Sequence, residues 1–221
     1  NLPVQLGLCC LNTEMRAKKP SVFSSRKMII RKIKEDGIDA LKEKIVQNLK
    51  DTIQLIEWNE KNGIKVFRLS SELFPHKSNK QVEDYTFDFA ADLFKQIGEK
   101  ARSYKQRLTF HPGQYNVIGS PNRECFLKTI NDLSYHAEVL DLMGMDQNSV
   151  LVIHGGGVYG NKETTIKRWC SQYKEMPEKV QKRVVLENCE KNFSIIDCLK
   201  VSEELNIPVV FDTHHFECYK L

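Results

Sequence analysis

Histidines are the residues of this chain whose placement first suggests chemistry. Five of the six histidines stand at or shortly after the end of a short apolar run: His76, His111, His154, His214 and His215. Two runs also end in a carboxylate, Glu187 after Val-Val-Leu and Asp212 after Val-Val-Phe. An acid that directly follows a buried run is costly unless its charge is paired or bound to a metal. Imidazole and carboxylate donors suit Zn²⁺, Mn²⁺ or Fe²⁺, so the pattern predicts a metal site.

The number of these ligands favours more than one ion. Each histidine taken alone is more simply explained as a structural residue, and His136 falls in the middle of a predicted helix. Several imidazoles and acids drawn from successive strands instead predict a cluster of two or three metals. Such a cluster commonly serves in-line attack on a phosphodiester, because it activates water and stabilises the leaving oxygen.

The runs that precede these residues are nearly continuous in apolar character, which is typical of buried parallel strands. We predict strands at Val4–Leu11, Lys65–Leu69, Arg107–Phe110, Ser149–Ile153, Arg183–Leu186 and Pro208–Phe211. Helical patterns lie between them, at 41–56, Phe87–Ala101, Asn122–Met143, Thr164–Tyr173 and Ser194–Leu205. This strict alternation predicts an α/β fold in which helices cover a parallel sheet.

A doubly wound open sheet and a closed barrel both fit this order of elements. The first strand is not followed by GxGxxG, and the chain contains no P-loop motif. Because the carboxyl ends of barrel strands converge on the active site, the ligands favour a TIM-type β/α barrel. We therefore predict one domain over residues 1–221 that supplies about six of the eight β-α units.

Composition narrows the classes of function only a little. The net charge of +4 and the pI near 8.6 permit nucleic-acid binding without requiring it. The sequence shows no membrane-length apolar run and no signal peptide, and its seven cysteines form no CxxC pair. We expect packed, reduced thiols and an intracellular protein of the cytoplasm or nucleus, neither secreted nor in a membrane. No obligate protein partner is inferred.

Basic residues gather in one loop-like stretch after the first strand: Arg16, Lys18, Lys19, Arg26, Lys27, Arg31, Lys32 and Lys34. In a barrel this stretch would lie on the active rim, where cations bind phosphates and release counterions. We select Lys18, Lys19, Arg26 and Lys27 as predicted DNA contacts. The alternative is a merely solvated surface.

The segment after His111 holds a second candidate DNA contact. Pro112 and Gly113 predict a tight turn that projects Gln114 and Tyr115 outward. A tyrosine ring can stack on a base, and a glutamine amide can replace lost base-pair hydrogen bonds. The alternative is a tyrosine that packs on the rim.

Taken together, these segments resemble the UV damage endonucleases, metal-dependent DNA repair enzymes related in fold to the endonuclease IV group. The resemblance spans nearly the whole chain, and its most specific part is His-Pro-Gly-Gln-Tyr. The matching segments are Leu6–Asn12, Phe67–Ser71, Leu73–His76, Phe110–Tyr115, His154–Gly156, Leu186–Asn188 and Phe211–His215.

The resemblance implies roles for individual residues. His111, His154 and Glu187 look like ligands of one ion, Glu187 bridges to a second with Asp212, and His215 serves a third. His76, Glu187 and His111 are then the expected catalytic residues, and divalent ions, usually Mn²⁺ with Zn²⁺ as an alternative, are the cofactors. Gln114 and Tyr115 look like a wedge into damaged double-stranded DNA, and Asn12 lines the lesion pocket. The implied reaction is a nick on the 5′ side of UV photoproducts.

The chain departs from the family pattern in two ways. Leu8 stands where the family often has tyrosine, and the last two strands, which carry further metal ligands, are absent. We therefore expect a C-terminally truncated chain that is weakly active or inactive by itself and holds a partial metal cluster. Three alternatives stay open: an abasic-site nuclease, a metal-dependent sugar isomerase or epimerase of the same barrel class, and an inactive DNA-binding fragment.

Overall fold

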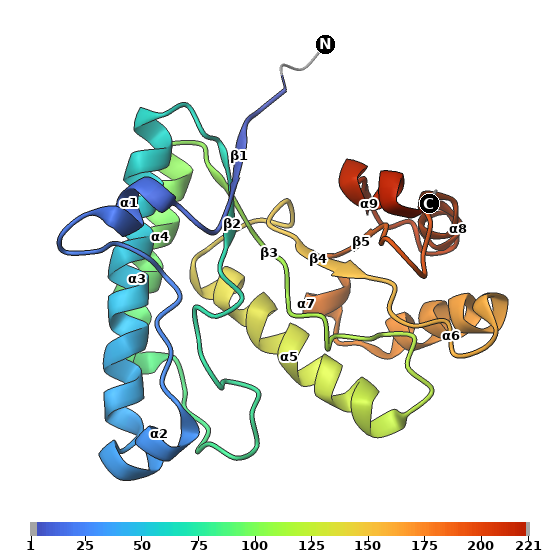
Figure 1. Ribbon diagram of the computed structural model, residues 1–221, viewed down its shortest axis with the longest axis horizontal. Helices are drawn as coiled ribbons and strands as arrows, with labels where there is room; N and C mark the ends of the chain where they lie inside the picture. The colour runs from blue at the N-terminus through green and yellow to red at the C-terminus, as the bar shows by residue number, and fades with distance from the viewer. Residues whose placement is uncertain (1–3, 220–221) are drawn as a thin grey trace. The chain divides into compact units, whose positions relative to one another are not determined.

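The structure, a computed structural model, describes residues 4–219. Strands and helices alternate along the chain as the sequence predicts (Figure 1). The chain divides into two compact units, which are described separately. Unit 1 is built from Asn1–His111 and Val139–Ser149, and unit 2 from Pro112–Glu138 and Val150–Leu221. Within the described residues, no helix combines the length and the apolar character needed to cross a membrane.

Unit 1 contains three strands with their helices: β1 (Gly7–Cys9), α1 (Thr13–Ala17), α2 (Ile30–Asp36), α3 (Ile38–Lys61), β2 (Val66–Leu69), the short 3₁₀ helix η1 (Asp88–Ala90), α4 (Ala91–Ser103) and β3 (Arg107–Phe110). β1 pairs in parallel with β2, and β2 with β3, so that Phe67 is the register partner of both Leu8 and Leu108. The long helices α3 and α4 pack side by side (Figure 1). On α3 the apolar side chains predicted to share one face are fully buried at Leu41, Ile45, Leu49 and Ile56, and Ile53 is half-buried. The helix ends at Lys61, and the C-cap Asn62 is followed by Gly63, whose φ is 70°.

Unit 2 repeats this arrangement. Its elements are β4 (Leu151–His154), α6 (Lys162–Glu175), α7 (Glu178–Gln181), β5 (Val184–Glu187), α8 (Ile195–Leu205), β6 (Val209–Val210) and α9 (Thr213–Tyr219). Helix α5 (Arg123–Leu142) is shared, because the division between the units falls between Glu138 and Val139. β4 pairs in parallel with β5, and β5 with β6. Val150, Val152 and Val185 form a buried cluster against which Val210 packs. A capping box of Ser194 and Asp197 begins α8.

A glycine allows a close approach behind the end of β4. Gly155 directly follows His154, and a Cβ atom built on it would lie 2.2–2.4 Å from three ring carbons of Phe193. That ring is completely buried, and its loop is closed by a hydrogen bond from Cys189 N–H to the Phe193 carbonyl. The loop that follows β5 is therefore packed directly on the main chain that follows β4.

The structure corrects several expectations. The first strand is shorter than predicted because Cys10, with φ of 44°, leaves the extended conformation. The stretch predicted to be loop-like contains α1 and α2, and α9 follows β6 without having been predicted. The cysteines are free, as expected, but Cys9 and Cys10 are exposed rather than packed.

Candidate metal centre

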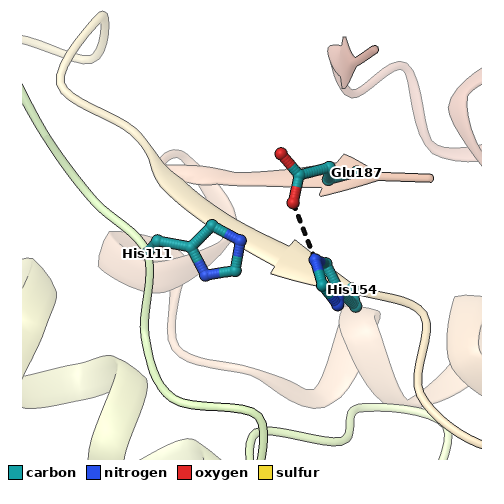
Figure 2. Close-up of side chains that lie close together, drawn as sticks. All are labelled: His111, His154 and Glu187. Carbon is teal, nitrogen blue, oxygen red and sulfur yellow. Dashed lines mark hydrogen bonds and ion pairs between the residues drawn. The ribbon is translucent and has the colours of Figure 1, made fainter. Parts of the chain in front are cut away.

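The centre of the candidate site is a pair of side chains at the ends of two neighbouring strands. His154 ends β4 and Glu187 ends β5, and the two residues are register partners. His154 Nε2 lies 2.7 Å from Glu187 Oε2, as the dashed line in Figure 2 marks. Glu187 is only 2% exposed. This hydrogen bond partly compensates for burying the carboxylate, and it places an imidazole and an acid at one point.

Two further predicted ligands join this pair within unit 2. One ligand atom each of Glu187, Asp212 and His215 lies within 4.8 Å of the others. The imidazole rings of His154 and His215 meet edge to face, with their centroids 5.1 Å apart. Both carboxylates and both imidazoles thus gather at the carboxyl ends of β4, β5 and β6. This donor set fits a divalent metal ion such as Mn²⁺ or Zn²⁺.

His111 and His76 lie in unit 1. His111 directly follows β3 and is the residue immediately before Pro112, where unit 2 begins. Figure 2 labels it together with His154 and Glu187. His76 has a positive φ of 63° and holds two hydrogen bonds: its Nε2 lies 2.8 Å from the Met28 carbonyl, and its Nδ1 lies 3.3 Å from Asn79 Nδ2. Both ring nitrogens of His76 are therefore engaged, which sequence reasoning did not anticipate.

The turn after His111 has the predicted form. Asn116 N–H donates to the Gly113 carbonyl, which leaves Gln114 and Tyr115 at the two central positions of the turn. Tyr115 is 83% exposed. Asn116 was not singled out from the sequence, yet its buried amide anchors the turn by donating to the Gly113 carbonyl and, over 2.8 Å, to Asp132 on α5. The Asn116 amide thus fixes the turn to α5, while the side chains of Gln114 and Tyr115 are exposed.

Asn12 is 6% exposed and caps α1, where its side-chain oxygen accepts a hydrogen bond from Met15 N–H over 2.9 Å. Its amide nitrogen is buried without a hydrogen-bond partner in the part of the chain that the structure describes. The cap gives Asn12 a structural role that sequence reasoning did not include, and it leaves the amide donor available.

Arg26 differs from the other predicted DNA contacts. It pairs with the buried Asp51 over 2.7 Å, donates to the carbonyls of Phe23 and Ser21, and lies 4.0 Å from the Phe23 ring centroid. Its side chain is 18% exposed. Because the guanidinium is used within unit 1, Arg26 is poorly placed to meet a phosphate.

The lysines of the same stretch are more accessible. Lys18 and Lys27 form exposed ion pairs with Glu14 and Glu72. Lys19 is exposed and has no ion pair among residues 4–219. Exposed pairs are weak enough for a phosphate to compete for the cation.

Comparison with known proteins identifies the family to which the sequence is similar. Residues 4–220 match the family model described as UV-endonuclease UvdE. A protein of Acanthamoeba polyphaga mimivirus is 42% identical over 96% of this chain, and the UV-damage endonuclease of Schizosaccharomyces pombe is 41% identical over the same share. The chain spans 65% of the length of the former and 36% of the latter.

Solved structures confirm the fold class. The crystal structure of SacUVDE matches with a TM-score of 0.89 and 29% identity, covering 98% of this chain and 71% of SacUVDE. Endonuclease IV from Thermus thermophilus matches with a TM-score of 0.55 at 15% identity, covering 76% of this chain and 61% of its own. A D-psicose 3-epimerase from Clostridium cellulolyticum matches with a TM-score of 0.54 at 13% identity, covering 75% of this chain and 59% of the epimerase. The latter two establish only a shared α/β fold of the TIM-barrel type. The family match over residues 4–220 has a more specific consequence: the chain belongs to the UV-endonuclease UvdE family.

Proposed function

We propose that this chain acts in DNA repair as a metal-dependent endonuclease that nicks the phosphodiester on the 5′ side of UV photoproducts. The observation that carries the proposal is the gathering of Glu187, Asp212 and His215 within 4.8 Å, with His154 bonded to Glu187. Family membership supports it, because a relative that shares 41% identity is named as a UV-damage endonuclease. An enzyme of this kind would work inside the cell, in the cytoplasm or the nucleus.

The proposed ligand sets follow the strands. His111, His154 and Glu187 would hold one ion, Glu187 and Asp212 a second, and His215 a third, with Mn²⁺ as the expected metal and Zn²⁺ as the alternative. A metal held by these residues would supply Lewis-acid stabilisation of the phosphate and an activated water. The buried Glu187 carboxylate would balance the positive charge, since it belongs to both of the first two proposed ligand sets.

We assign His76 a positioning part in the reaction. Because its Nε2 is hydrogen-bonded to the Met28 carbonyl, His76 ties the segment between α1 and α2 to the turn after β2. That segment carries Lys27 next to Met28. In this role His76 would set where the basic residues meet DNA, rather than carry a proton itself.

The substrate is proposed to be damaged double-stranded DNA. Gln114 and Tyr115, exposed at the tip of their turn, would enter the duplex where damaged bases leave the stack. Lys18, Lys19 and Lys27 would bind phosphates. Asn12 would reach the lesion pocket through its amide nitrogen, while its oxygen continues to cap α1.

The test compares UV-irradiated and untreated duplexes of one sequence, each incubated with the protein and Mn²⁺, with the cut position mapped on both strands. We expect nicks on the 5′ side of photoproducts and none in untreated DNA. Cleavage confined to duplexes with an abasic site would instead establish an abasic-site nuclease. Binding without cleavage, in protein shown to contain metal, would indicate a DNA-binding chain and contradict the proposal.

A further inference from the structure

Asn188 is the residue next to Glu187, and it is 1% exposed. Its side-chain amide pairs with both main-chain polar groups of Asp212: Nδ2 donates to the Asp212 carbonyl over 3.0 Å, and Oδ1 accepts from Asp212 N–H over 2.8 Å. The ladder between β5 and β6 ends at the pair of Glu187 and Val210. The Asn188 side chain therefore continues the pairing beyond the last ladder position and fixes the main chain of Asp212.

The main chain of Asn188 makes a second connection. Its carbonyl lies 3.0 Å from His215 Nδ1. A carbonyl oxygen can only accept, so Nδ1 carries the hydrogen, and in the neutral ring the lone pair is on Nε2. His215 N–H also donates to Asp212 Oδ1 over 2.8 Å. One residue thus orients the backbone of the acid and the ring of the histidine.

We infer that Asn188 is a positioning residue for the metal centre: without touching the metal, it preassembles Asp212 and His215 as ligands. The inference rests on the proposed function, because it assigns Asn188 a task at that site. Outer-shell hydrogen bonds of this kind select the tautomer and orientation of a ligating histidine. They matter more here because β6 is two residues long and pairs only with β5 among the described strands of unit 2.

The side-chain chemistry explains why asparagine stands at this position. Asp212 presents one donor and one acceptor, and a primary amide offers the complementary acceptor and donor in one plane. Aspartate in its place would keep the acceptor but bring a second oxygen against the Asp212 carbonyl. Alanine would remove both partners and leave the N–H and carbonyl of Asp212, which are part-buried, without these hydrogen bonds.

The variants to compare are Asn188→Asp and Asn188→Ala, with Gln172→Glu and Gln172→Ala as matched controls. Gln172 is also a buried amide of unit 2 that donates to two carbonyls, those of Ile118 and Ser120, but it lies on α6 and contacts no proposed ligand in these bonds. Mn²⁺ affinity is measured by titration followed by electron paramagnetic resonance. We expect the Asn188 variants to bind about 10–100-fold more weakly and the Gln172 variants to match the native chain. Equal affinity of the Asn188 variants and the native chain would overturn the inference.

A second readout requires no metal. Nitrogen NMR of imidazole in the metal-free chain should show His215 as the Nδ1–H tautomer. Asn188→Ala keeps the main-chain carbonyl that accepts from Nδ1 but loses both side-chain bonds to Asp212, to which His215 N–H is bonded. The ring should then no longer be held against that carbonyl, and the signals should shift to an averaged mixture of tautomers. Identical His215 signals in the native and variant chains would refute the positioning role. If the native chain bound no Mn²⁺, the proposed function would fail, while the NMR comparison would still decide the role of Asn188. If Asn188→Ala does not fold, Asn188→Asp, which keeps one of the two bonds, decides by the same measurements.

Discussion

His154 and Glu187 are direct partners across two parallel strands, and their side chains bond over 2.7 Å at the last position of both strands. In a parallel ladder, neighbouring strands end on the same edge, so residues at matched ends face the same space. The buried Glu187 also belongs to the group of ligand atoms that contains Asp212 and His215. Its position in the register therefore places Glu187 beside the candidate ligands at the carboxyl ends of β4 and β6.

This position leads us to expect a large effect from a substitution at Glu187. We expect Glu187→Gln to lower the Mn²⁺ content and to reduce nicking by about 100-fold or more, since even outer-shell changes cost about 10–100-fold. The similar shape of the amide should leave the fold intact, as circular dichroism would show. Metal content and nicking rate are measured for the native chain and for Glu187→Gln. Unchanged metal content in the folded variant would rule out a ligand role for Glu187.

The turn at Gln114 and Tyr115 allows a separate test on DNA. The double variant Gln114→Ala/Tyr115→Ala should weaken binding to irradiated duplex by about 5- to 150-fold, because a stacked base contributes about 1–3 kcal/mol. Mn²⁺ binding should not change. Tyr104→Ala, which alters a tyrosine before β3 at the opposite end of that strand, is the control. Equal affinity of the double variant and the native chain for irradiated DNA would disprove the wedge.

The basic stretch predicts a salt effect. Replacing Lys18, Lys19 and Lys27 by alanine should reduce the slope of log affinity against log salt by up to about 0.9 for each phosphate that the variant no longer neutralises. The matched control replaces Lys95, Lys128 and Lys167, which form exposed helical ion pairs elsewhere. Fluorescence anisotropy with duplex DNA over a range of salt measures both slopes. A slope that falls equally in the two triple variants would contradict specific phosphate binding by the stretch.

Arg26 should behave as a structural residue. Because the side chain of its ion-pair partner Asp51 is 2% exposed, Arg26→Ala would leave a buried charge unpaired and should destabilise the protein by about 3–5 kcal/mol. Arg31→Ala, in an exposed helical pair with Glu35, should cost about 0.5 kcal/mol or less. Urea denaturation measures both variants. Near-equal stabilities of the two variants would show that the Asp51 pair contributes little.

His136 should make stability depend on pH. Burial of the ring lowers the pKa of His136, despite the opposing effect of Asp132. A depressed pKa means that the unfolded chain takes up the proton before the folded chain does as pH falls. The contribution of neutral His136 to the free energy of unfolding is therefore complete above about pH 6.5 and is lost as pH falls below it. His136→Gln should therefore have a flatter profile of unfolding free energy between about pH 7 and pH 5, by at most about 1.4 kcal/mol per pH unit. Parallel profiles in urea denaturation would contradict this origin.

The sequence was sufficient to predict the carboxyl ends of β2 to β6 to within one residue, because alternating strands and helices dictate where carboxyl-terminal residues gather. His154, Glu187 and Asp212 were found for this reason. Helix α9 was missed because its seven residues show no apolar periodicity. Its end is instead held by a tertiary bond, in which Lys162 on α6 donates to the Tyr219 hydroxyl over 2.8 Å. A contact between residues 57 positions apart has no local signature.

Arg26 illustrates a second limit. In the sequence it is one of several cations in a basic stretch, and counting charges gives all of them the same role. Its partner Asp51 lies in α3, where it is buried beside apolar residues. Only the packing of this helix distinguishes an internal ion pair from a phosphate contact. From the sequence, Asn188 was likewise only the last residue of a segment that matches the family, since its partner is the main chain of Asp212.

The contact between Gly155 and Phe193 restricts how this protein can vary. Any side chain at position 155 would occupy space that the Phe193 ring already fills. The two positions can therefore change only as a pair, and a larger residue at 155 would require a much smaller one at 193. In a library with both codons randomised, functional clones should keep glycine at 155 whenever an aromatic ring is retained at 193. Substitutions next to the proposed ligand His154 would thus be selected through packing, even where metal binding could tolerate them.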